Sequence, residues 1–161
     1  MSTGAVNGKT ATIAVVRGIL LAIFVLGVLG TGAELLLIKH TEDLRQWVPL
    51  LLILSSFLVL GWHAVEQRRL SMRFFQAIMI AFIAAGPAGS YFHYQGSVEF
   101  KLESNPSLKG WALFWEAMRS KAPPPLAPGL MIQLGLIGLV YSYRHPALTV
   151  STENESKKEG E

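Results

Sequence analysis

Four histidines are the residues of this sequence best suited to chemistry, because a neutral imidazole can bind a metal ion or exchange a proton. Each stands near the end of an apolar run. His40 and His93 fall at one predicted membrane face, and His63 and His145 fall at the other. Two imidazoles at each face could hold haem, as in a b-type membrane cytochrome. Haem ligands should lie inside a helix bundle rather than at its ends, so haem is kept as an alternative.

Carboxylates near the outer pair of histidines suggest a different site. Glu42 and Glu99 follow His40 and His93 closely in the sequence. Two imidazoles with a carboxylate are suitable ligands for a divalent ion such as Zn, Cu or Fe. We therefore predict a metal or small-ligand site at the outer mouth, built from Glu34, His40, Glu42, His93 and Glu99. No tight motif such as HExxH occurs, and solvated residues at helix ends are the competing interpretation.

Glu34 stands out because it lies inside an apolar run, about 7 Å from the outer end by the helical rise. A carboxyl group at that depth is costly unless it is neutral or paired. Gln133 lies at a similar depth in the last run, and its amide can hydrogen-bond either protonation state. We predict a contact between Glu34 and Gln133, either as a tie between helices or as part of a ligand or proton site.

Other kinds of chemistry find little support in the sequence. The chain has no cysteine, which excludes disulfides and thiolate metal sites. It has no Gly-rich phosphate loop, no nucleophile elbow and no nucleophile and base at recognisable spacing. No basic stretch with interleaved aromatic residues indicates nucleic-acid binding. We therefore predict no catalytic residues, and the only cofactors considered are a divalent metal and haem.

Four apolar runs position these residues. The 161-residue chain is 51% hydrophobic and 16% charged, a composition typical of membrane proteins. A helix needs roughly 20 apolar residues to cross about 30 Å of hydrocarbon, and each run is close to that length. The sequence predicts an all-α membrane protein, an antiparallel bundle of four transmembrane helices within residues 13–148. The predicted spans are residues 18–38, 47–65, 74–92 and 126–143.

The first run has an alternative interpretation as a secretory signal, with a possible cleavage site at residues 31–33. The run continues to Ile38, which favours a retained helix. Between the third and fourth runs, helical spacing of apolar residues predicts an amphipathic helix at 106–121, on the outer membrane surface or over the bundle mouth. Residues 1–12 and 149–161 are small or polar and are predicted to be disordered.

Basic residues near the ends of the runs predict the orientation. Most lie at one face, which the positive-inside rule makes cytoplasmic: Lys9, Arg17, Arg68, Arg69, Arg73 and Arg144. Both termini are therefore predicted to be cytoplasmic. The stretches GAELLLIKHTEDLRQWVPLLL and LAPGLMIQLGLIGLVYSYRHP look similar to small bacterial membrane proteins. That resemblance implies the bacterial plasma membrane and carries no activity.

Small residues predict where the helices pack, because close approach in lipid depends on them. They form short stripes in three of the runs: Gly27 and Gly30, then Ala81, Ala85 and Gly89, then Gly135 and Gly138. Such stripes could also bind other membrane subunits or a second copy. An accessory or structural subunit of a larger membrane complex is therefore the main alternative function. The predicted partners are the lipid bilayer and possible membrane subunits, without nucleic acid.

Overall fold

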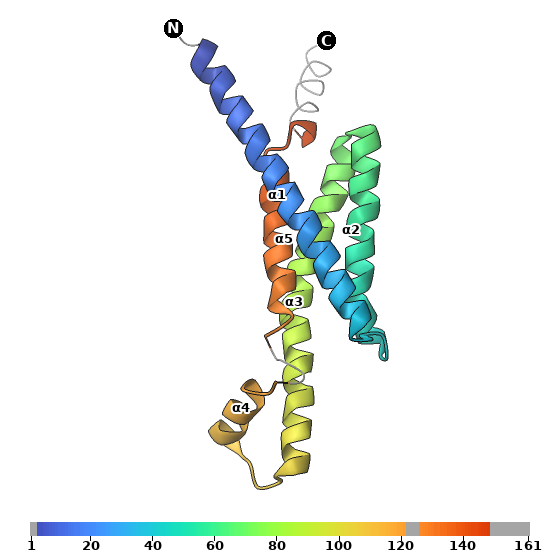
Figure 1. Ribbon diagram of the computed structural model, residues 1–161, viewed down its shortest axis with the longest axis vertical. Coiled ribbons are helices and arrows are strands. Elements are labelled where there is room, and N and C mark those ends of the chain that lie inside the picture. Colours follow the sequence, from blue (N-terminus) through green and yellow to red (C-terminus); the bar gives the residue numbers. More distant parts are fainter. Residues whose placement is uncertain (1–2, 122–125, 149–161) are drawn as a thin grey trace, which may run out of the picture.

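The computed structural model describes residues 3–121 and 126–148 (Figure 1). All of the regular secondary structure in these residues is helical. Three helices are long: α1 (Thr3–Leu37), α2 (Trp47–Glu66) and α3 (Arg69–Ser104). The 3-10 helix η1 (Leu44–Gln46) precedes α2, and two shorter helices follow α3, namely α4 (Gly110–Met118) and α5 (Gly129–Ser142).

Three of these helices are long and apolar enough to cross a membrane, within Ala11–Leu37, Leu44–Glu66 and Arg69–Ser104. They correspond to the first three predicted spans. The fourth run forms α5, which is apolar but has 14 residues. At about 1.5 Å per residue α5 is about 21 Å long, less than the roughly 30 Å of a hydrocarbon core.

Two helices extend beyond the bounds that the sequence predicted. α1 begins at Thr3, so residues 3–12, which we expected to be disordered, are helical. α3 continues past residue 92 to Ser104, into what we expected to be a loop. Proline disfavours a helical residue before it, and Asn105, which precedes Pro106, has φ −147° and ψ 89°. The predicted disorder of residues 149–161 concerns residues outside those described.

The amphipathic helix predicted in the long loop is present as α4, shorter than its predicted 106–121. α4 lies beside the C-terminal half of α3, which projects beyond α1 and α2 (Figure 1). Lys101 of α3 forms an ion pair with Glu116 of α4 at 3.1 Å, and the rings of Tyr94 and Phe114 are 5.9 Å apart. α4 therefore packs against α3 rather than over the mouth of the bundle.

α3 is the central helix of the fold. It packs along α5 and α2, whereas α1 crosses α5 and touches α2 over a short stretch (Figure 1). Phe24 of α1 is fully buried at this crossing, where its ring lies 5.6 Å from that of Phe75 and 6.3 Å from that of Phe82. Outside this core the helices expose many large apolar side chains. A hydrocarbon environment would cover such surfaces.

Glycines bring the helices close together, as the small-residue stripes predicted. A Cβ on Gly135 of α5 would lie 2.7 Å from the carbonyl oxygen of Met79 in α3. A Cβ on Gly27 of α1 would lie 2.6 Å from Leu134 Cδ2, and one on Gly89 would lie 2.9 Å from Pro128 Cβ. Gly30 has no such neighbour within 4 Å. The stripes are thus confirmed at the first three glycines but not at Gly30.

Candidate functional site

The four histidines form two pairs, each made by segments far apart in the sequence. The ring centroids of His40 and His93 are 6.0 Å apart. Those of His63 and His145 are 5.0 Å apart, with the rings nearly perpendicular. These are the two pairs that the sequence assigned to opposite faces. We call them the outer pair and the inner pair.

The outer pair depends on the way α1 ends. Lys39 adopts a left-handed conformation with φ 53°, and the His40 N–H donates to the carbonyl of Leu35 at 2.9 Å. This is the Schellman arrangement that commonly ends a helix. It turns the chain sharply, so that His40 follows the last turn of α1 while its ring faces His93 of α3. Both side chains are half-buried.

Burial lowers the pKa of His40 below its ordinary value, and the nearby His93 lowers it further. Both effects favour the neutral imidazole at His40. The neutral form carries a nitrogen lone pair, which is what a metal ion requires. The outer pair thus has the protonation state that a metal site needs at His40.

The carboxylates predicted for the outer site are not brought together with the histidines. Glu34, Glu42 and Glu99 are all exposed. Within residues 3–121 and 126–148, no group of three or more His, Asp or Glu side chains is arranged to hold a metal. Because α3 stays helical beyond His93, Glu99 lies about 9 Å farther along the axis than it. The outer site is therefore reduced to its two imidazoles.

Glu42 belongs to a short capping structure instead. Its backbone N–H donates to Oε1 of Gln46 at 2.8 Å, and the N–H of Asp43 donates to the same oxygen at 3.4 Å. The Gln46 side chain thus ties down the backbone between α1 and α2. The competing interpretation of Glu42, a solvated residue beside a helix end, describes its position better than a metal ligand does.

The predicted contact between Glu34 and Gln133 is not formed: both side chains are exposed and no hydrogen bond joins them. Helical phase explains this result. Gly32 of α1 is buried against Ile53, and Glu34 lies about 200° farther round the helix. On α5, Leu134 faces Gly27, which turns the adjacent Gln133 away by about 100°.

The inner pair has a defined hydrogen-bond pattern. His63 Nδ1 lies 2.8 Å from Ser71 Oγ, and the Ser71 hydroxyl donates to the carbonyl of Arg68 at 2.8 Å. Because Ser71 has a single hydroxyl proton, the proton between it and His63 must come from Nδ1. When His63 is neutral, its Nε2 therefore carries a lone pair.

His145 has the opposite tautomer. Its Nδ1 accepts the backbone N–H of Ala147 at 3.3 Å. Burial, followed by the neighbouring charges of His63 and Arg17, lowers the pKa of His145 to about 4. His145 is therefore neutral at pH 7 and carries its proton on Nε2. The lone pair that a metal would need is already engaged, which makes the inner pair a poorer metal site than the outer pair.

Arg17 positions the segment that carries His145. From α1, its guanidinium donates to the carbonyls of Tyr143 and Arg144, just after α5 ends. Cations are favourable at the C-terminal end of a helix, where carbonyl groups lack partners. The Tyr141 ring lies 5.6 Å from the His145 ring and completes this cluster.

The sequence does not mark Ser71, Gln67 or Tyr141 as site residues. Gln67 has a left-handed conformation with φ 49° that ends α2, and Ser71 lies in the first turn of α3. No local motif marks a serine that approaches a histidine across such a turn. The short connection between the second and third runs was the one available signal, since it requires the adjoining helix ends to meet.

Comparisons with known proteins add no family: no family model, no curated protein and no solved structure matches the chain. The function is therefore inferred from the geometry of the two histidine pairs and their surroundings.

Proposed function

We propose that this chain is an integral membrane protein that binds a divalent transition-metal ion at the outer end, through His40 and His93. The proposal places both termini in the cytoplasm of a bacterial cell. It also places α1, α2, α3 and α5 in the plasma membrane as an antiparallel four-helix bundle. The basic residues at the inner end and the apolar helix surfaces support this placement.

The spacing of the outer pair carries the metal proposal. Two imidazoles that bind one metal ion have ring centroids about 5 to 6 Å apart, because each metal–nitrogen bond is about 2 Å. The outer pair has a separation of 6.0 Å, and burial together with His93 lowers the pKa of His40, which favours its neutral form. Among divalent ions, Cu²⁺ has the highest affinity for nitrogen ligands. Water or a small ligand would fill the remaining coordination positions.

Metal content of the purified protein tests the proposal. We expect the protein, loaded with Cu²⁺ in detergent and desalted, to retain about one equivalent, and His40→Ala or His93→Ala to lower the affinity at least about 10-fold. His145→Ala is the matched control, because it removes an imidazole from the inner pair. The proposal is wrong if His145→Ala lowers Cu²⁺ binding as much as His40→Ala does, or if the wild-type protein binds none.

Haem is a second candidate, favoured by the presence of a histidine pair near each end of the helices. Two axial imidazoles on opposite sides of one iron require centroids about 6 Å apart. The outer pair has this separation, but the inner pair is closer at 5.0 Å. A Soret band in protein purified from its own membrane would establish haem in place of a free metal ion. Its absence would exclude this candidate.

An accessory role in a larger membrane complex is supported by a separate observation. Trp111 and Trp115 of α4 are 68% and 46% exposed. Their rings lie 5.6 Å apart on a helix whose main packing partner is α3. Exposed aromatic clusters of this kind favour protein interfaces or the membrane surface. Crosslinking in native membranes from a photoreactive residue at position 111 would detect a partner subunit. Crosslinks to lipid alone would contradict this role.

A further inference from the structure

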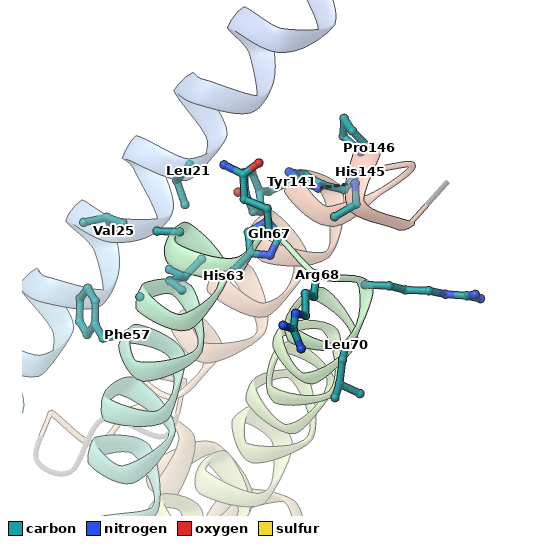
Figure 2. A pocket seen from close by; sticks show the side chains of 15 residues that line it. Leu21, Val25, Phe57, His63, Gln67, Arg68, Leu70, Tyr141, His145 and Pro146 are labelled. Carbon is teal, nitrogen blue, oxygen red and sulfur yellow. Dashed lines mark hydrogen bonds between the residues drawn. The ribbon is translucent and has the colours of Figure 1, made fainter. Parts of the chain in front are cut away.

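An open cleft of about 1290 Å³ lies at the inner end of the molecule (Figure 2). One part of its lining is apolar and comes from α1 and α2: Leu21, Val25, Phe57 and Leu60. The other part is polar and comes from the helix ends: His63, Gln67, Arg68, Arg69, Tyr141 and His145. Figure 2 shows the side chains of His63, Gln67, Tyr141 and His145 converging beside this apolar wall. The cleft is thus amphipathic.

The arrangement of α1 and α2 leaves the cleft accessible from the side. α1 packs chiefly on α5, and toward the inner end it diverges from α2 (Figure 1). Two small residues of α2, Gly61 and Ala64, line the cleft and are exposed. Because both helices belong to the apolar spans, a molecule entering between them would come from the lipid layer.

The charge at this end is strongly positive. Arg17, Arg68, Arg69, Arg73 and Arg144 all belong to it, and none of the residues lining the cleft is acidic. Among the described residues, the nearby acidic group is Glu66, which forms an ion pair with Arg68 at 3.3 Å. The Arg68 side chain is still 71% exposed. An anionic group would therefore meet an excess of cations at the mouth of the cleft.

We propose that this cleft binds an anionic phospholipid of the inner leaflet. Its phosphate would lie at Arg68 and Arg69, and an acyl chain would lie along Val25 and Phe57. The tautomers of the inner pair suit such a headgroup. The Nε2 proton of His145 can be donated to a phosphate oxygen, and the Nε2 lone pair of His63 can accept a headgroup hydroxyl. Phosphatidylglycerol supplies both groups and carries the required negative charge.

Lipid binding to the full-length protein in detergent micelles tests this proposal by native mass spectrometry. We expect phosphatidylglycerol to bind at least about 10-fold more tightly than phosphatidylcholine with the same acyl chains. The double variant Arg68→Gln with Arg69→Gln should lose that preference. The matched control is Arg73→Gln with Arg144→Gln, which removes the same charge from the same end without altering a lining residue. Equal losses in the two double variants would show general charge attraction and overturn the site.

The contribution of the apolar wall needs a variant that leaves the charges unchanged. Ala64→Trp places a large ring at the exposed opening of the cleft, whereas Ala84→Trp places one on an exposed position of α3 outside it. We expect the first variant alone to reduce binding of phosphatidylglycerol. Unaltered binding in Ala64→Trp would contradict the proposal. The proposal would also be contradicted if inorganic phosphate stabilised the protein against heat as much as phosphatidylglycerol does, because phosphate lacks the acyl chain.

The lipid site and the outer metal site are at opposite ends of the helices, so their tests are independent. His40→Ala should leave lipid binding unchanged, and the Arg68 and Arg69 variant should leave Cu²⁺ binding unchanged. A shared loss of both properties would indicate unfolding, which the thermal transition measured without lipid or metal would reveal.

Discussion

His63 donates its Nδ1 proton to Ser71 Oγ over 2.8 Å, across the turn between α2 and α3. The Ser71 hydroxyl in turn donates a hydrogen bond to the carbonyl of Arg68. Both side chains are buried. These two hydrogen bonds therefore connect the last turn of α2 to the first turn of α3. They also orient His63, which lines the inner cleft.

Ser71→Ala removes the acceptor of this hydrogen bond and leaves His63 Nδ1 without its partner. A buried donor that loses its partner costs about 1–3 kcal/mol, so we expect the free energy of unfolding to fall by that amount. Ser55→Ala is the control, because Ser55 is half-buried in α2 and lacks such a bond. Unfolding in a denaturing detergent series measures both. Equal effects of the two substitutions would show that the hydrogen bond contributes nothing specific.

Gly135→Ala should destabilise the contact between α5 and α3. The new methyl group would lie 2.7 Å from the Met79 carbonyl oxygen, which belongs to the backbone and cannot move cheaply. Overpacking of this kind costs about 1–3 kcal/mol. Gly30→Ala is the matched control, since no atom lies within 4 Å of the position its methyl group would occupy. The thermal midpoint should fall for Gly135→Ala only. An unchanged midpoint in Gly135→Ala would mean that α5 and α3 can separate without a loss of stability.

The stability of the protein should decrease in mild acid because of His145. Its pKa is about 4 in the folded chain, against the ordinary value of 6.5. Between these values the unfolded chain binds more protons, so stability is highest above pH 6.5 and declines as the pH falls toward 4. We expect a thermal midpoint several degrees lower at pH 5 than at pH 7.5.

The control for this pH dependence is His145→Gln, which removes the titrating ring. We expect the difference between pH 5 and pH 7.5 to shrink in this variant, because its remaining titratable groups still respond to pH. The assignment is contradicted if the wild-type protein and His145→Gln lose the same number of degrees.

Arg17→Gln should loosen the chain after α5. Arg17 donates to the carbonyls of Tyr143 and Arg144, and the substitution removes a charge-assisted bond to each. Hydrogen exchange followed by mass spectrometry should show faster exchange over residues 143–148 than in the wild-type protein. Arg144→Gln is the matched control, because Arg17 binds the backbone carbonyl of that residue rather than its side chain. Slow exchange in Arg17→Gln would show that the segment is held by other contacts.

The long helices could be predicted because an apolar run near 20 residues has few structural solutions in a membrane. The extension of α3 could not be predicted in the same way, since residues 93–104 are polar and resemble a loop in composition. Their helix continues to Ser104 and ends where Asn105 and Pro106 follow. Hydropathy identifies the part of a helix that lies in lipid, whereas local helix-breaking residues determine where the helix ends.

The pairing of the histidines could be predicted for a similar reason. Antiparallel helices bring alternate ends of the runs to one face, which places His40 near His93 and His63 near His145. The direction in which each carboxylate points depends instead on the rotation of its helix about the helix axis. The side of α1 on which Glu34 lies follows from which residues of α1 contact α2. That contact is set by tertiary packing around Gly32 and Ile53. A sequence position alone does not determine it.

The length of α3 has a consequence for the shape of the molecule. Its 36 residues form one helix of about 54 Å, with Pro87 inside it. α4 packs near one end of this helix, and the other end begins at the turn beside Ser71 and the inner cleft. Gly135 and Gly138 of α5 approach Phe75, Met79 and Ile83 in the N-terminal half of α3, so the other half, which carries α4, projects from the bundle as an arm (Figure 1).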